Sequence, residues 1–84
     1  MSAPELSEAI LATLRRVVPA APPQIVPDSP FRDQFEMDSL DFLNFILALE
    51  KEHRVKIPEG RYPRCASLAG ATKVLEEALA ASVR

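Results

Sequence analysis

Hydrophobic residues recur at helical spacing near the start of the chain, and polar residues fall largely between them. Spacings of three and four residues place an apolar stripe on one face of a helix. Ser2 and Glu5 form a capping-box pattern that favours a helix start, and Pro19 bars continuation of the helix. We therefore expect an amphipathic helix that ends before Pro19. Its inward stripe consists of Leu6, Ile10, Leu14 and Val17.

A second apolar pattern follows Asp38, a residue type favoured at helix N-caps. Asp41, three residues later, adds negative charge beside the unpaired amides of the first turn. The pattern predicts a helix that begins at Asp38 or Ser39 and extends to about His53. Its apolar residues form a wider arc than one packing face requires, so part of the arc is either buried on a second side or exposed for a partner. One sector contains Phe42, Phe45, Ile46 and Leu49, and its neighbour contains Leu40, Leu43 and Leu47.

Prolines recur through residues 19–30 and interrupt any helix there. We expect this segment to form a long ordered loop that crosses between two helices and is not a flexible linker. Ile25 and Val26 within the loop, together with Phe31 and Phe35 beyond it, are expected to hold it against the core.

The segment from Glu59 to Ala66 contains Gly60 and Pro63, so it can form at most a short turn or an irregular helical piece. Ser67 is expected to cap a last helix. These elements predict an all-α fold, an antiparallel four-helix bundle with a short or irregular third helix and a long first loop. A chain of 84 residues has room for one domain, which we expect to span residues 1–84. The inward residues of the last helix are Leu68, Ala71, Val74, Leu75, Ala78 and Leu79.

Composition narrows the range of functions. The formal net charge is −2, so the chain lacks the excess of Lys and Arg that sequence-independent nucleic-acid binding requires. Acidic residues dominate residues 28–41 and basic residues dominate 51–64, which predicts one acidic and one basic end. The sequence contains neither an apolar run of about 18 residues nor a signal-peptide pattern, so we expect no membrane span. A monomer is the favoured state.

His53 and Cys65 are the only residues of their types. They cannot supply the four ligands of a structural zinc site or form an internal disulfide, and they do not complete a catalytic set of nucleophile, base and oxyanion donor. We therefore expect no metal and no enzymatic activity. A single cysteine fits the reducing cytoplasm. We expect Cys65 to be a partly buried structural thiol, and His53 to complement the dipole at a helix C-terminus.

Ser39 has the most distinctive surroundings of any polar residue, in the run Asp38-Ser39-Leu40. A serine at the start of a helix suits an attached anionic group. Unpaired amides and the helix dipole favour a phosphodiester there by a few tenths to about 1 kcal/mol. The preceding loop is expected to leave the hydroxyl accessible to a modifying enzyme. The simpler alternative is an ordinary first-turn serine beside the N-cap Asp38.

The run Glu36-Met37-Asp38-Ser39-Leu40-Asp41 resembles the Asp-Ser-Leu attachment motif of acyl carrier proteins. The helix through Leu49-Glu50-Lys51-Glu52 and its exit at Ile57-Pro58 are similar to the family's second helix, and the resemblance extends loosely over nearly the whole chain. It implies that a phosphopantetheinyl transferase attaches 4'-phosphopantetheine, taken from coenzyme A, to Ser39 between Asp38 and Leu40. It further implies a carrier of acyl thioesters in fatty acid, lipid or polyketide-type biosynthesis.

The resemblance also implies an acyl-loading ligase and acyl-transfer or condensing enzymes as partners. Family members of bulk fatty acid synthesis often have acids where Asn44 and Lys51 stand here, so we expect specialised partners. The residues Phe35-Glu36-Met37 also differ from the Leu-Gly that commonly precedes the family's motif. The docking residues implied are Leu40, Asp41, Leu43, Asn44, Leu47 and Glu50. A cavity for an acyl chain is expected among Ile10, Phe45, Ile46, Leu68 and Leu75.

Two other functions fit the same residues. An aminoacyl or peptidyl carrier of a nonribosomal pathway would share the serine and the arm. An unmodified helical adaptor would instead bind a partner helix through Leu40, Leu43 and Leu47, and it predicts that Ser39→Ala leaves partner binding intact.

Overall fold

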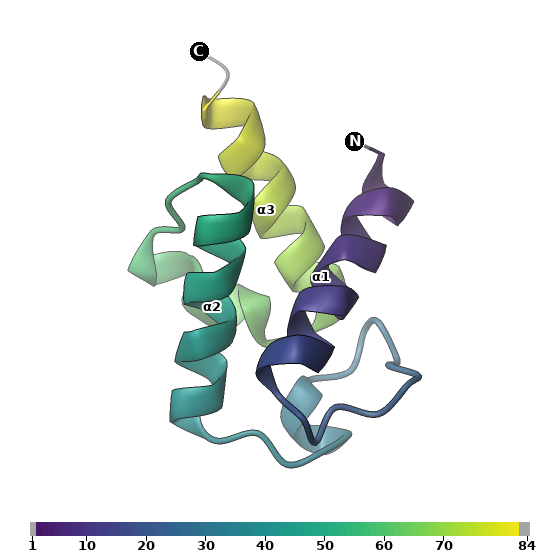
Figure 1. Ribbon diagram of the computed structural model, residues 1–84. Helices are drawn as coiled ribbons and strands as arrows, with labels where there is room; N and C mark the ends of the chain where they lie inside the picture. Colours follow the sequence, from purple (N-terminus) through teal and green to yellow (C-terminus); the bar gives the residue numbers. More distant parts are fainter. Residues whose placement is uncertain (1, 83–84) are drawn as a thin grey trace.

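The computed structural model describes residues 2–82, and the regular elements in this range are all helical. α1 runs in the opposite direction to α2 and α3, while η2, a 3₁₀ helix, crosses between α2 and α3 (Figure 1). The predicted helical bundle, with its long first loop and short third helix, is confirmed. The elements in chain order are α1 (Ala3–Val17), η1 (Phe31–Asp33), α2 (Ser39–His53), η2 (Glu59–Ala66) and α3 (Leu68–Ser82).

The start of α1 is held by the predicted capping box. The Glu5 amide donates to the Ser2 hydroxyl at 3.3 Å, and the Glu5 carboxylate accepts from the Ser2 amide at 3.2 Å. The Ser2 hydroxyl and amide bonds lower the pKa of the Glu5 carboxyl. The helix ends at Val17, two residues before Pro19, as the sequence predicted.

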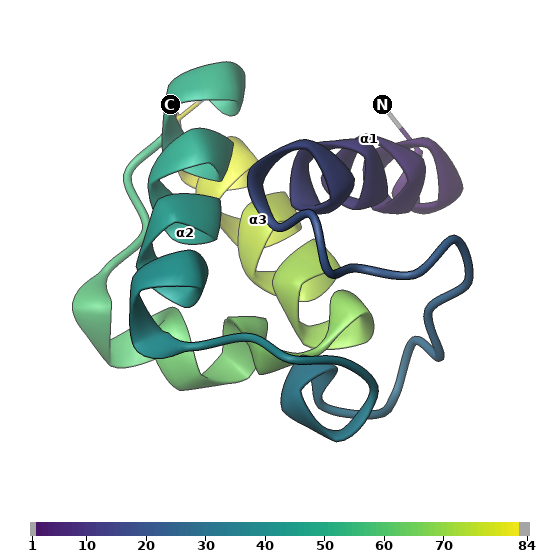
Figure 2. The same ribbon diagram turned by 60° about the horizontal axis from the view of Figure 1, so that its bottom comes forward.

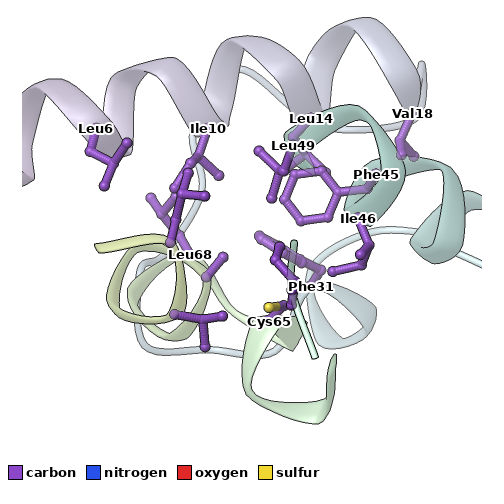
Figure 3. Close-up of a cluster of buried hydrophobic side chains, with 14 of the residues drawn as sticks. Leu6, Ile10, Leu14, Val18, Phe31, Phe45, Ile46, Leu49, Cys65 and Leu68 are labelled. Carbon is purple, nitrogen blue, oxygen red and sulfur yellow. The ribbon is translucent and has the colours of Figure 1, made fainter. Parts of the chain in front are cut away.

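The core lies where α1 faces α2 and α3, because α1 packs against both of them. Leu6, Ile10 and Leu14 project from α1 into this core, and Figure 3 shows Leu68 of α3 below Ile10 and Phe45 of α2 beside Leu14. The ring of Phe45 meets that of Phe31 edge to face, with the centroids 5.7 Å apart. Other fully buried members are Ile46, Leu49, Ile57, Cys65 and Leu75.

The loop of residues 19–30 lies on the side of the bundle away from α2 (Figure 2). Ile25 packs against the core, as predicted, but the Val26 side chain is 59% exposed, so the prediction that Val26 holds the loop was wrong. The backbone of Val26 makes the contacts instead. Its amide donates to Gln34 Oε1 at 2.7 Å and its carbonyl accepts from Gln34 Nε2 at 2.9 Å. One side-chain amide thus ties the loop to the segment after η1.

η2 is a 3₁₀ helix of eight residues, at the long end of what this helix type allows. Its C-terminal end lies against the first turn of α3, where Ser67 caps the helix by accepting from the Gly70 amide at 3.1 Å. A Cβ atom at Gly70 would lie 1.8 Å from the Arg64 carbonyl oxygen. Only glycine therefore permits η2 and α3 to approach this closely.

Candidate functional site

Ser39 is the first residue of α2 and its side chain is exposed. The helix start is capped by its neighbours. Asp38 Oδ1 accepts from the Asp41 amide at 2.7 Å, and Asp41 Oδ2 accepts from the Asp38 amide at 3.3 Å. The predicted N-cap at Asp38 is confirmed, and Asp41 completes a reciprocal cap that the sequence analysis had not specified. Because these two carboxylates cap the helix, the Ser39 hydroxyl is not needed for capping.

A basic side chain, that of Arg32, lies beside this hydroxyl. The Arg32 Nη2 atom is 3.5 Å from Ser39 Oγ, at the outer limit of a hydrogen bond. Arg32 belongs to η1, which is fixed in place by the buried side chain of Phe31. The sequence offered only a weak signal for this contact, which is that Arg32 is the one basic residue between positions 28 and 41.

Two hollows flank the start of α2, and their linings differ in charge. The first has a volume of about 290 Å³ and is mainly apolar, with Arg32 as its cationic residue. The second has a volume of about 530 Å³ and contains three carboxylates. The first is lined by Pro30, Phe31, Arg32, Met37, Phe42, Tyr62, Pro63 and Ala66. The second is lined by Ala20, Glu36, Met37, Asp38 and Asp41.

Neither hollow is the cavity that the sequence analysis expected. The residues expected to surround that cavity are buried together in the core, and none of them lines either hollow. They pack against one another across α1, α2 and α3, because each belongs to the inward stripe of its helix. The five residues are Ile10, Phe45, Ile46, Leu68 and Leu75.

Comparison with known proteins identifies the family. The family described as "Phosphopantetheine attachment site" matches residues 8–75, a range that includes Ser39 and both flanking hollows. The acyl carrier protein of Thermosynechococcus vestitus is 34% identical over 59 residues, which cover 70% of this chain and 73% of the relative. That of Brachyspira hyodysenteriae is 35% identical over 54 residues, or 64% of this chain and 69% of the relative. The chain belongs to the acyl carrier protein family.

Membership of the acyl carrier protein family establishes the cofactor and the general role of the chain. The domain of this family bears a covalently attached 4'-phosphopantetheine, and its members are carriers and not enzymes. The predictions of a phosphopantetheine cofactor and of a non-enzymatic carrier are therefore confirmed. Family membership also implies a phosphopantetheinyl transferase and acyl-handling enzymes as partners. Ser39, the residue that the sequence predicted for this attachment, is exposed at the start of α2.

The second helix of this acyl carrier protein exposes three leucines. Leu40, Leu43 and Leu47 are 65%, 42% and 48% exposed. The sequence left open whether this sector is buried, and the structure places it at the surface of the bundle. Helical periodicity adds Asn44 and Lys51 to the same side of α2, and both are exposed.

Both acids predicted to dock partners, Asp41 and Glu50, have contacts within the protein. Asp41 caps α2, and Glu50 Oε2 accepts from the Ile57 amide at 2.7 Å, which fixes the exit from the helix. The exposed face of α2 therefore consists mainly of leucines, with the neutral polar residue Asn44 among them. Lys51 and Arg54 are exposed at its C-terminal end. This differs from the acid-rich second helix expected for the acyl carrier proteins of bulk fatty acid synthesis.

Cys65 and His53, the other residues considered for chemistry, lie in the core and at the end of α2. Cys65 is fully buried, and burial raises the pKa of its thiol to about 11, so the thiol is not a nucleophile near neutral pH. His53 is half-buried in the last turn of α2. Within residues 2–82, no cluster of His, Cys, Asp and Glu could hold a metal ion. In the same range, every helix is too short or too polar to cross a membrane.

Proposed function

We propose that Ser39 is the residue of this acyl carrier protein that bears the 4'-phosphopantetheine arm. The observation that supports this most directly is an exposed hydroxyl at the first position of α2, beside a helix cap made entirely by Asp38 and Asp41. In the attachment reaction, a bond forms between Ser39 Oγ and the phosphorus that bears the pantetheine in coenzyme A. The pyrophosphate bond breaks, adenosine 3',5'-bisphosphate leaves, and the hydroxyl proton is released.

The proposed role of Asp38 and Leu40 follows from their places beside Ser39. Asp38 fixes the first turn, so the backbone that bears the hydroxyl keeps one position at the start of the helix. Leu40 is 65% exposed and gives a transferase an apolar contact next to the reacting atom. The arm supplies a terminal thiol that holds an acyl group as a thioester. Because the arm is tethered, the acyl group reaches successive enzymes at a high effective concentration.

We propose that partner enzymes dock on the exposed face of α2, formed by Leu40, Leu43, Asn44 and Leu47. The three leucines expose apolar surface to water, and a docked partner would bury it, which favours binding. Asp41 and Glu50 belong to the same face but contribute through only part of each carboxylate, because Asp41 Oδ2 already accepts from the Asp38 amide and Glu50 Oε2 from the Ile57 amide. An acyl-loading ligase and acyl-transfer or condensing enzymes are the proposed partners.

The charge of this face favours a specialised lipid or polyketide-type pathway. A partner for bulk fatty acid synthesis is expected to present basic residues toward an acid-rich helix. Here the C-terminal half of the face presents Lys51 and Arg54, which would repel such a surface. We further propose that residues 1–84 act as one carrier domain in the cytoplasm.

The test is intact-protein mass after incubation with coenzyme A and a broad-specificity phosphopantetheinyl transferase. The protein should gain one phosphopantetheine. Ser39→Ala should gain none, whereas Ser29→Ala, a matched change in the nearby loop, should be modified fully. Circular dichroism verifies that each variant is folded. Absence of modification in the folded parent, with the transferase active on a control carrier, would contradict the proposal and favour the adaptor alternative.

An aminoacyl or peptidyl carrier would give the same mass gain, so a second step is needed to distinguish it. The modified protein is incubated with ATP and either an acyl or an aminoacyl ligase, and the bound thioester is identified by mass. An acyl thioester supports the acyl carrier assignment. If an aminoacyl thioester forms in preference, the protein is an aminoacyl carrier and the acyl carrier assignment is wrong.

A further inference from the structure

Within residues 2–82, Arg32 is the one basic side chain in contact with the Ser39 hydroxyl, with 3.5 Å between Nη2 and Oγ. We propose that Arg32 binds the phosphodiester of the group attached at Ser39, at the edge of the apolar hollow lined by Phe42 and Tyr62. This inference rests on Ser39 being the attachment residue. It concerns a residue of η1, outside the Asp-Ser-Leu motif.

The charges around Ser39 favour one direction for an attached anion. On one side, Glu36, Asp38 and Asp41 line a shared hollow, so a phosphodiester placed there would meet three carboxylates. On the other side lies the Arg32 guanidinium at the edge of the apolar hollow. Attraction to Arg32 and repulsion by the carboxylates act in the same direction.

The guanidinium is available for this contact. The ion pairs found within residues 2–82 are Arg16 with Glu52 and Arg61 with Glu77, and neither includes Arg32. The non-bridging oxygens of a phosphodiester on Ser39 lie two bonds from Oγ, so they fall within hydrogen-bond reach of a group already 3.5 Å from that oxygen. The planar fork of arginine suits two such oxygens at once.

The backbone of Arg32 is held in place although its side chain is exposed. Phe31, the preceding residue, is 1% exposed and packs edge to face on Phe45. Gln34, two residues further on, holds η1 against the loop through Val26. The side chain therefore reaches Ser39 from a constant position, which reduces the ordering required when it binds.

The experiment uses the fully modified protein, verified by mass, and its unmodified form. The Nε–Hε resonance of Arg32 is followed by ¹⁵N NMR, and the phosphodiester is followed by ³¹P NMR. Modification should shift the Arg32 resonance and leave that of Arg54 in place. Arg54 is the matched control, since it lies at the far end of α2, about 22 Å from Ser39.

Salt and substitution provide two further readouts of the same contact. Raising the salt from about 10 mM to about 1 M shortens the range of charge interactions from about 30 Å to about 3 Å, so it should reverse part of the Arg32 shift. Arg32→Gln should move the ³¹P resonance, Arg32→Lys should move it less, and Arg54→Gln should leave it unchanged.

The outcomes separate this inference from the proposed function. If the protein is modified at Ser39 but modification leaves the Arg32 resonance unmoved, Arg32 does not bind the phosphodiester, and the proposed function stands. If Arg32→Gln leaves the ³¹P resonance of the modified protein in place, the inference is likewise overturned. If the transferase does not modify Ser39, the proposed function and this inference both fail.

Discussion

Thr13 of α1 donates a hydrogen bond of 2.8 Å to the Glu52 carboxylate of α2, 39 positions along the chain. Thr13 is buried, and the same carboxylate also forms an ion pair with Arg16 of α1. Polar contacts thus join α1 and α2 at the edge of an otherwise apolar interface.

Replacing Thr13 by valine keeps the shape of the side chain and removes the hydroxyl, which lies 2.8 Å from Glu52 Oε1 and 3.1 Å from the Ala9 carbonyl. We expect a loss of about 1 to 2 kcal/mol in the free energy of unfolding, because the acceptor is charged but partly solvated. Urea denaturation gives the value. In a Glu52→Ala background, which lacks the acceptor, the same substitution should cost less, and an equal cost in both backgrounds would show that the bond to Glu52 contributes nothing.

Arg54 ends α2 in the left-handed region, with φ 55° and ψ 46°. Glycine adopts this conformation without the clash of a Cβ atom, so Arg54→Gly should raise the free energy of unfolding by about 0.5 to 1 kcal/mol. Arg54→Ala removes the same side chain but keeps the Cβ atom, and it should give no such gain. Thermal unfolding of the three proteins compares them, and equal stability of the Gly and Ala variants would contradict this account.

The two glycines of the chain are expected to respond differently to the same change. Gly70→Ala places a Cβ atom against the Arg64 carbonyl, which is backbone and cannot rotate away, so it should cost about 3 kcal/mol. A Cβ atom at Gly60 meets nothing within 4 Å, so Gly60→Ala should change stability little. Chemical denaturation tests the pair, and a tolerated Gly70→Ala would refute the close approach of η2 and α3.

Burial of the Cys65 thiol predicts a pH dependence of stability. The pKa is about 11 in the folded protein against an ordinary value of 9.0, so the unfolded chain loses the proton first as the pH rises. The protonated Cys65 thiol therefore makes its full contribution to the free energy of unfolding below pH 9. As the pH rises toward 11, that free energy declines by about 2 to 3 kcal/mol in total. Unfolding free energies of the parent and Cys65→Ala, measured across this range, isolate it. Parallel curves for the two proteins would argue against the raised pKa.

The sequence predicted the helix starts well because capping is local. Ser2 with Glu5, Asp38 with Asp41, and Ser67 with Gly70 each lie three residues apart, so their bonds depend on one turn of backbone. The apolar stripes were predictable for the same reason. These features were sufficient to place Ser39 at the exposed start of α2.

Contacts set by the course of the loops could not be predicted. The meeting of Arg32 with Ser39 depends on where η1 lies, which in turn depends on Gln34 bonding to the backbone of Val26. Nothing in the spacing of these residues indicates that pairing. The exposure of Val26 was missed because hydrophobicity alone suggested a buried side chain, whereas its backbone makes the contact.

The proline-rich loop has a consequence for the unfolded chain as well as for the fold. Each proline between positions 19 and 30 has a fixed φ, so the unfolded loop samples fewer conformations and loses less entropy when it orders. A few contacts then suffice to hold it, among them those of the Gln34 amide with Val26 and of the Ala69 amide with the Pro27 carbonyl. The segment that presents Arg32 is preorganised, and its guanidinium lies beside the Ser39 hydroxyl before any group is attached there.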